Sequence, residues 1–157
     1  MPVLGVIHAP AVGLTCYAQK GGGAFCREYG ITRKLPLFKP TPPLTATVSR
    51  QHLNKTTREF LRVNGNNEFV KKGSSLKFGT VTSGKAMLYP RFEGSMEWDI
   101  AAGHVILAEA YCSLTDLVTG KPPAYNKPSL RNNPFIASAP RIDIGNLNIP
   151  GIPITHA

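Results

Sequence analysis

The sequence lacks the features of a membrane-spanning, secreted or disulfide-built protein. No stretch approaches the ~20 apolar residues of a membrane-spanning helix. The first eight residues contain no basic region followed by a long apolar core, so we expect no signal peptide. The three cysteines, Cys16, Cys26 and Cys112, form neither an even set nor a Cys-x-x-Cys pair, which argues against a disulfide framework or a zinc knuckle. We therefore expect reduced thiols and a cytoplasmic protein, with peripheral attachment at the inner membrane left open.

Acidic residues are also scarce. Nine of them stand against 18 Lys and Arg, and the net charge of +9 favours an anionic partner. The basic residues are spread from Lys20 to Arg141 without a cluster longer than Lys71-Lys72, and no helix-turn-helix or RNA-binding signature is present. Specific nucleic-acid binding is therefore not favoured.

The composition is that of a globular chain of about one domain. Of 157 residues, 42% are hydrophobic and 17% charged, and 15 Gly with 14 Pro predict many turns and few long helices. The pattern predicts three parts. Residues 1–43 form a β-meander and a Pro-rich connector, residues 44–138 an α/β domain, and residues 139–157 an irregular tail.

The first part begins with a predicted hairpin of strands at 3–8 and 14–20. We interpret Gly21-Gly22-Gly23 as a sharp turn rather than a phosphate-binding loop. Such a loop is followed by Gly-Lys-Ser/Thr and a helix, and neither pattern follows here. Beyond the connector, strands and helices alternate, which predicts an α/β layer within an α+β chain. The expected strands are 44–49, 69–70, 85–91, 113–118 and 135–138, and the expected helices are one capped by Asn54, 74–82 and 98–111.

Asp99 stands at the start of the last of these helices, in the sequence EWDIAAG. A carboxylate there commonly satisfies free backbone N–H groups and complements the helix dipole. The same carboxylate could instead ligate a metal ion. The sequence alone leaves both roles open.

Several motifs, in this order, resemble the inositol monophosphatase superfamily, and within it the bacterial 3'(2'),5'-bisphosphate nucleotidases. The resemblance covers residues 2–138. Its motifs are Val3–Pro10 (VLGVIHAP), Ser49–His52 (SRQH), Gly73–Phe78 (GSSLKF), Leu88–Phe92 (LYPRF), Trp98–His104 (WDIAAGH), Thr119–Pro122 (TGKP) and Asn133–Phe135 (NPF).

The resemblance implies a sugar-phosphatase fold, here its C-terminal α/β layer preceded by a β-hairpin of a truncated first domain. It also implies Mg²⁺ as the cofactor and a metal-activated water that attacks a phosphate monoester. Asp99 is then a metal ligand. By the same resemblance, residues 44–138 are a nucleotide-binding domain. The residues implied in substrate binding are Ser49, His52, Gly73, Ser75, Lys77 and Arg91.

Each of these residues also has an ordinary structural role open to it. His52 can end a strand at the surface, and Lys77 can be a solvated residue on a helix. Arg91 can extend along the surface from a strand end. Gly73 and Ser75 belong to a common type of helix start.

The superfamily's main metal motif, Asp-Pro-Leu/Ile-Asp-Gly-Thr, and the Glu-Glu pair before it are not in this sequence. Asp99 alone cannot hold Mg²⁺ tightly, because the ion gives up its waters reluctantly. We assign no catalytic residue and expect an incomplete or inactive phosphatase that in complete form converts adenosine 3',5'-bisphosphate to AMP. The alternatives are a non-catalytic phosphonucleotide-binding module and an inositol monophosphatase-type sugar phosphatase.

The missing strands and helices also predict an exposed apolar face on the hairpin of residues 3–26. An N-terminal half or a second copy of the chain is the partner we expect there.

Overall fold

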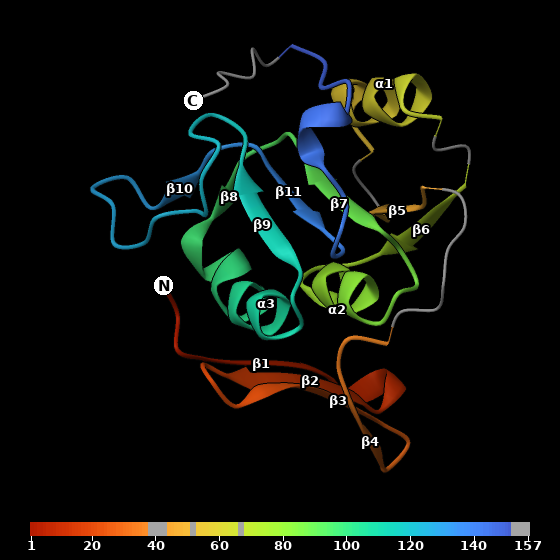
Figure 1. The fold of residues 1–157 in the computed structure, drawn as a ribbon, viewed down its shortest axis with the longest axis vertical. Helices are drawn as coiled ribbons and strands as arrows, with labels where there is room; N and C mark the ends of the chain where they lie inside the picture. The colour runs from red at the N-terminus through yellow and green to blue at the C-terminus, as the bar shows by residue number, and fades with distance from the viewer. Residues whose placement is uncertain (38–43, 51–52, 66–67, 152–157) are drawn as a thin grey trace.

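The computed structural model describes residues 1–37, 44–50, 53–65 and 68–151, and these form four layers (Figure 1). A four-stranded sheet lies at one end, and two helices separate it from a five-stranded sheet. A third helix and the C-terminal segment cover the far side of the second sheet. The expected α/β architecture is confirmed.

The first sheet is an antiparallel meander in the order β1-β2-β3-β4, formed by β1 (Leu4–Ala9), β2 (Leu14–Gln19), β3 (Gly23–Glu28) and β4 (Ile31–Lys34). The short 3-10 turn Pro10–Val12 joins β1 to β2. The edge strand β4 was not predicted, because all four of its residues are exposed and show no apolar alternation.

The triple glycine is the turn that the sequence predicted. The backbone N–H groups of Gly21 and Gly23 donate to the carboxylate of Glu109, at 2.9 and 2.8 Å. These two hydrogen bonds lower the pKa of Glu109. The amide groups that a phosphate-binding loop would offer are thus occupied by a side chain of the same chain.

The middle layer holds α2 (Leu76–Thr82) and α3 (Glu97–Glu109). Helix α3 is apolar nearly all round because both its faces are covered: Val105, Ile106 and Leu107 are fully buried. One core unites these residues with Ile7 of the first sheet and Phe135 of the second. The segment 1–37 and the α/β layer therefore share one core, although the sequence suggested a boundary near residue 43.

The second sheet has the order β6-β5-β7-β11-β9. Strand β5 pairs in parallel with both β6 and β7, whereas β11 is antiparallel to β7 and β9. Its strands are β5 (Ala46–Ser49), β6 (Phe69–Lys72), β7 (Leu88–Arg91), β9 (Ser113–Asp116) and β11 (Phe135–Ser138). A two-residue ladder of β8 (Ser95–Met96) and β10 (Arg131–Asn132) is an addition that the sequence did not predict.

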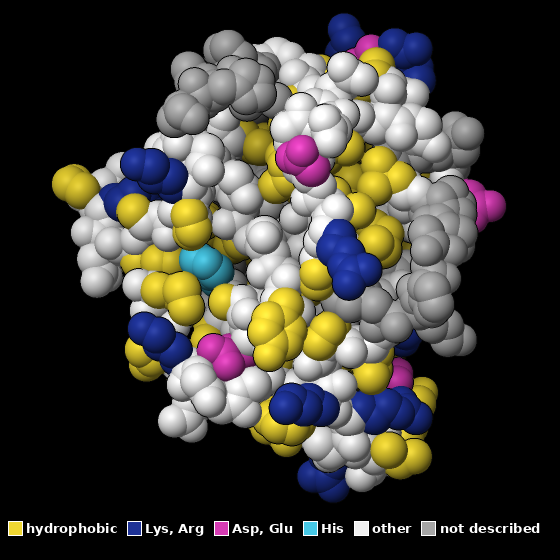
Figure 2. Space-filling model, viewed as in Figure 1, with side chains coloured by type: hydrophobic (Ala, Val, Ile, Leu, Met, Phe, Trp, Pro, Cys, Tyr) yellow, Lys and Arg dark blue, Asp and Glu magenta, His cyan; other side chains and the backbone are white. Residues whose placement is uncertain are grey.

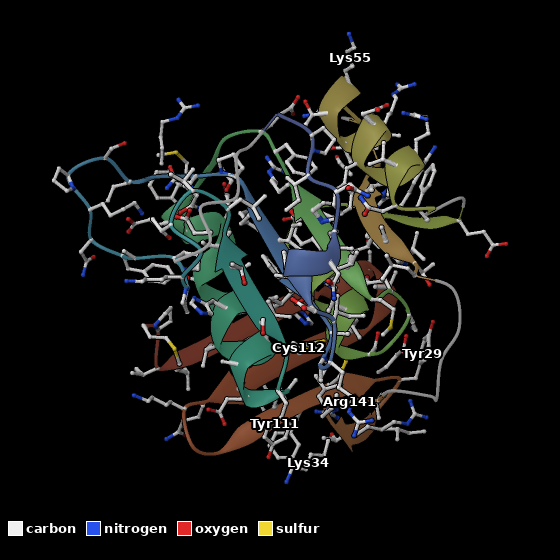
Figure 3. The ribbon with its side chains drawn as sticks, turned by 45° about the horizontal axis from the view of Figure 1, so that its top comes forward. Tyr29, Lys34, Lys55, Tyr111, Cys112 and Arg141 are labelled. Carbon is white, nitrogen blue, oxygen red and sulfur yellow. The ribbon has the colours of Figure 1, made fainter. Side chains whose placement is uncertain are left out.

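Helix α1 (Lys55–Val63) begins as predicted, since Asn54 Oδ1 accepts the Thr57 N–H at 2.7 Å. It buries Phe60 and Leu61 against the outer side of the second sheet. Lys55 at its first turn and Lys34 at the end of β4 project from opposite ends of the molecule (Figure 3).

The C-terminal segment 139–151 is irregular in secondary structure but packs against the body of the protein. It has only one short 3-10 turn, Ile144–Asn146, yet Ile144 and Leu147 pack on the core beneath α1. Asn64 and Asn148 exchange hydrogen bonds of 2.8 and 2.9 Å. Residues 139–151 therefore combine irregular secondary structure with tertiary packing of apolar side chains that show no periodicity.

The outer face of the first sheet is open and apolar, as predicted. Leu4 and Val6 are 64% and 54% exposed, and the rings of Tyr17 and Phe25 stack with centroids 5.6 Å apart. These side chains line a shallow hollow of about 370 Å³. In the part of the chain that the structure describes, no helix is long and apolar enough to cross a bilayer.

Candidate functional site

A cavity of about 550 Å³ opens where the ends of β5 and β7 meet the first turns of α2 and α3. Most of the substrate-binding residues suggested by the sequence line it, together with the suggested metal ligand. Neighbouring residues complete the wall. The lining residues are Ser49, Arg50, Gly73, Ser74, Ser75, Lys77, Phe78, Tyr89, Arg91, Ser95, Asp99, Ile100 and Phe135.

Lys77 is a buried cation in the wall of this cavity rather than a solvated one. Its residue is only 2% exposed, and Nζ donates to the Ser74 carbonyl at 2.8 Å. Nζ also lies 4.9 Å from the centroid of the Tyr89 ring, a cation–π contact. Burial, with a smaller contribution from Arg91, lowers the pKa of Lys77 to about 8. The ammonium is therefore incompletely compensated and favours an incoming anion.

Arg91 lies at the end of β7 on the same cavity. Its Nη2 donates to the Gly94 carbonyl at 3.2 Å, while its buried Nε has no hydrogen-bond partner among the described residues. A buried donor without an acceptor is costly, so this atom is suited to an acceptor supplied by a ligand. Burial raises the pKa of the neighbouring Tyr89 to about 12, which keeps its phenol neutral.

Asp99 is the third residue of α3, and its side chain caps the start of the helix. Its Oδ2 accepts the Met96 backbone N–H at 2.8 Å. A carboxylate has acceptor sites on both oxygens, so this contact leaves capacity for a cation. The start of α3 also brings the positive end of a 13-residue helix to the cavity.

Glu97, two residues earlier, is committed elsewhere. Its carboxylate accepts the backbone N–H groups of Asn126 and Lys127 and the Lys127 ammonium, the last at 2.5 Å. The Lys127 contact and the two backbone donors lower the pKa of Glu97. This carboxylate fixes the 126–127 loop to α3 and does not line the cavity.

The donor set of the cavity does not fit a complete Mg²⁺ site. Mg²⁺ requires near-octahedral oxygen ligands, often with carboxylates from several segments. Within residues 1–37, 44–50, 53–65 and 68–151, Asp99 is the one carboxylate lining the cavity, and no group of three His, Cys, Asp or Glu could hold a metal. A metal ion here would need further ligands.

Six of the seven suggested site residues thus meet at one cavity, while His52 lies outside the described residues. Their roles stay predictions. Sequence reasoning missed Arg50, whose guanidinium lies beside Gly73, with Nη2 3.4 Å from the position of an added Cβ. The sequence feature that could have identified Arg50 as a site residue is its position between Ser49 and His52 in the SRQH motif. Basic side chains elsewhere on the face seen in Figure 2 are scattered.

Comparison with known proteins gives a consistent match. A model of the inositol monophosphatase family matches residues 1–146. The 3'(2'),5'-bisphosphate nucleotidase CysQ of Escherichia coli (strain K12) is 38% identical over 124 residues, which are 79% of this chain and 49% of that protein. The CysQ of Aggregatibacter actinomycetemcomitans is 38% identical over 136 residues, 85% of this chain and 50% of the other.

Solved structures agree. The crystal structure of CysQ from Bacteroides thetaiotaomicron matches with a TM-score of 0.80 and 34% identity, covering 90% of this chain and 59% of that one. Staphylococcal IMPase-II matches with a TM-score of 0.68 at 20% identity, covering 87% and 51%, which shows the fold alone. The chain spans about half the length of the curated relatives it matches.

Proposed function

Because this chain belongs to the inositol monophosphatase family, we propose that it forms the substrate-binding part of a Mg²⁺-dependent phosphatase of the 3'(2'),5'-bisphosphate nucleotidase type. The proposed substrate is adenosine 3',5'-bisphosphate, and the complete enzyme would release its 3'-phosphate to give AMP. The observation that carries the proposal is the cavity that combines the buried Lys77 ammonium, the unpaired Arg91 Nε and the Asp99 carboxylate.

The cationic side suits a phosphate group. A phosphoryl oxygen can accept from Arg91 Nε, which supplies the acceptor that this buried atom needs, and the nearby charge of Lys77 adds a Coulomb attraction that burial strengthens. Charge-assisted hydrogen bonds of this kind contribute about 1.5–3 kcal/mol each. These two residues hold and orient the anion, and Arg50 extends the positive wall toward the rest of the ligand.

The acidic side of the cavity is incomplete. In this family a bound metal activates water and stabilises the oxygens of the reacting phosphate. Asp99 would contribute one ligand, and the remaining ligands would come from a polypeptide segment other than the residues described. The open apolar face of Leu4, Val6, Tyr17 and Phe25 supports this arrangement, since it offers an area for such a segment to cover.

The test separates binding from turnover. Calorimetric titration with adenosine 3',5'-bisphosphate measures binding by the chain alone, and phosphate release with Mg²⁺ is measured for the chain alone and mixed with the N-terminal half of a relative. We expect binding by the chain and phosphate release only in the mixture. Absence of binding would contradict the proposal.

A second candidate function is a phosphonucleotide-binding module without hydrolysis. The single cavity carboxylate among the described residues favours it. Binding without phosphate release in either sample would select this candidate. A sugar phosphatase of the inositol monophosphatase type is distinguished by titration with inositol monophosphate, which would then bind more tightly than the nucleotide.

A further inference from the structure

Cys16 and Cys26 form a close thiol pair on the inner face of the first sheet. They are directly opposite one another on the antiparallel strands β2 and β3, and their sulfur atoms lie 2.9 Å apart. Opposed residues on such strands have Cβ atoms about 4.5–5.5 Å apart, and a disulfide needs about 3.5–4.5 Å. A small approach of two neighbouring strands would therefore allow a covalent bond.

The packing around Cys16 keeps its sulfur beside its partner. The residue is 1% exposed, and its Sγ lies 3.3 Å from the position that a Cβ on Gly79 would occupy. Helix α2 therefore lies against the Cys16 sulfur and covers it. Cys26 is only partly buried, so it is the more accessible of the two residues.

From this geometry we propose that Cys16 and Cys26 are a reversible redox site, a dithiol that a low-molecular-weight disulfide of the glutathione class converts to an intramolecular disulfide. The proposal does not depend on the phosphatase function. The odd number of cysteines is then explained, because two of the three thiols form a pair and the third, Cys112, takes no part in the reaction.

The greater exposure of Cys26 assigns the roles of the two thiols, and the directions of their pKa shifts agree with this assignment. The hydrogen bond between the two sulfurs lowers the pKa of Cys26; Lys85 and Arg33 lower it further, while burial and Glu28 oppose them. The same hydrogen bond, with burial, raises the pKa of Cys16. Thiolate is the reactive form of cysteine, so Cys26 attacks first.

The reaction balances in two exchanges. The Cys26 thiolate attacks one sulfur of the oxidant disulfide, forms a mixed disulfide and releases one thiolate, which takes up a proton. Cys16 then loses its proton to the second departing thiolate as its sulfur attacks Cys26 Sγ. The protein loses two protons and two electrons, and the oxidant disulfide gains them and becomes two thiols.

Cys112 provides a control within the chain. It lies just beyond the C-terminal end of α3 in the interior (Figure 3), and burial raises its pKa to about 12. Its sulfur hydrogen-bonds to the Ala110 carbonyl and has no thiol beside it. It should react slowly and form no intramolecular disulfide.

The experiment treats the reduced chain with oxidised glutathione, quenches with acid, unfolds the protein and alkylates the remaining thiols before mass spectrometry. We expect a species that has lost two hydrogens and carries one alkyl group, on Cys112, and that dithiothreitol reverses. Its formation should be at least ~10-fold faster than any modification of Cys112. Cys112→Ser should form the disulfide at the same rate as the chain of unchanged sequence.

Two variants test the order of attack. Cys16→Ser should accumulate glutathione on Cys26, because the resolving thiol is gone, and Cys26→Ser should leave Cys16 unmodified. If circular dichroism shows that either variant does not fold, peptide mapping of the oxidised chain of unchanged sequence tests the proposal instead. Glutathione retained on Cys26 in that chain, three alkylated cysteines after oxidation, or equal reactivity of Cys112 would overturn the proposal.

Discussion

Gly103 of α3 lies directly against the ring of Phe78 of α2: a Cβ added at Gly103 would sit 2.2 Å from Phe78 Cδ2. No side chain larger than hydrogen fits there without movement. The contact sets the distance between the two helices whose first turns bring Lys77 and Asp99 to the same cavity.

Gly103→Ala should therefore destabilise the protein, although alanine is the better helix former. Overpacking of this kind costs about 1–3 kcal/mol. Gly79→Ala is the matched control, because the nearest atom to its added Cβ, Cys16 Sγ, is 3.3 Å away. Urea denaturation of both variants should show a clearly larger loss for Gly103→Ala, and equal losses would contradict the packing argument.

Lys77→Met should change how stability depends on pH. The pKa of Lys77 falls from 10.5 to about 8 on folding, so between these values the unfolded chain holds a proton that the folded chain has lost. Raising the pH through this window stabilises the unmodified protein relative to the variant, by roughly 2–3 kcal/mol. Denaturant titrations at pH 7.5 and 10.5 measure the difference.

Lys55→Met is the control for this effect, since Lys55 is exposed and points away from the body of the molecule (Figure 3). It should show no such change relative to the unmodified chain. A Lys77→Met difference that does not shift between the two pH values would exclude a buried ammonium at this position.

Arg91→Gln should weaken binding of adenosine 3',5'-bisphosphate by about 10–100-fold, the equivalent of one charge-assisted hydrogen bond. Calorimetric titration gives the affinity. Arg62→Gln removes a charge from an exposed ion pair with Glu59 on α1 and should leave the affinity unchanged. Equal weakening in both variants would indicate attraction by net charge rather than a site.

His104 should make the protein sensitive to acid. It is 4% exposed, its Nδ1 lies 2.8 Å from the Tyr125 hydroxyl, and burial lowers its pKa from 6.5 to about 4. As pH falls through this window the unfolded chain takes up a proton that the folded chain does not, so stability is lost. From pH 6.5 to 4.5 the loss should be roughly 2–3 kcal/mol.

Denaturation of His104→Phe across the same pH range should give a smaller slope, whatever its stability at pH 7. His8→Phe, which changes an exposed histidine of β1, should keep the full slope. An unchanged slope in His104→Phe would assign the acid sensitivity to other groups.

Local patterns in the sequence predicted most elements because their causes are local. Asn54 caps α1, the apolar circumference of α3 predicts burial on both sides, and the glycine run makes a turn. Strand β4 and the β8–β10 ladder were missed, since an exposed strand and a two-residue ladder leave no apolar period. The packing of segment 139–151 could not be predicted, because it comes from contacts with α1 and the second core cluster.

The sequence by itself determined the family, the order of elements and the residue types available for an anion site, because motifs and periodicity are properties of neighbouring residues. Only the tertiary structure decided which of them meet. It buried Lys77, left Arg91 Nε without an acceptor among the described residues, committed Glu97 to Lys127 and set Cys16 against Cys26. Burial and pairing depend on residues distant in the chain, and these set the charge and reactivity of each group.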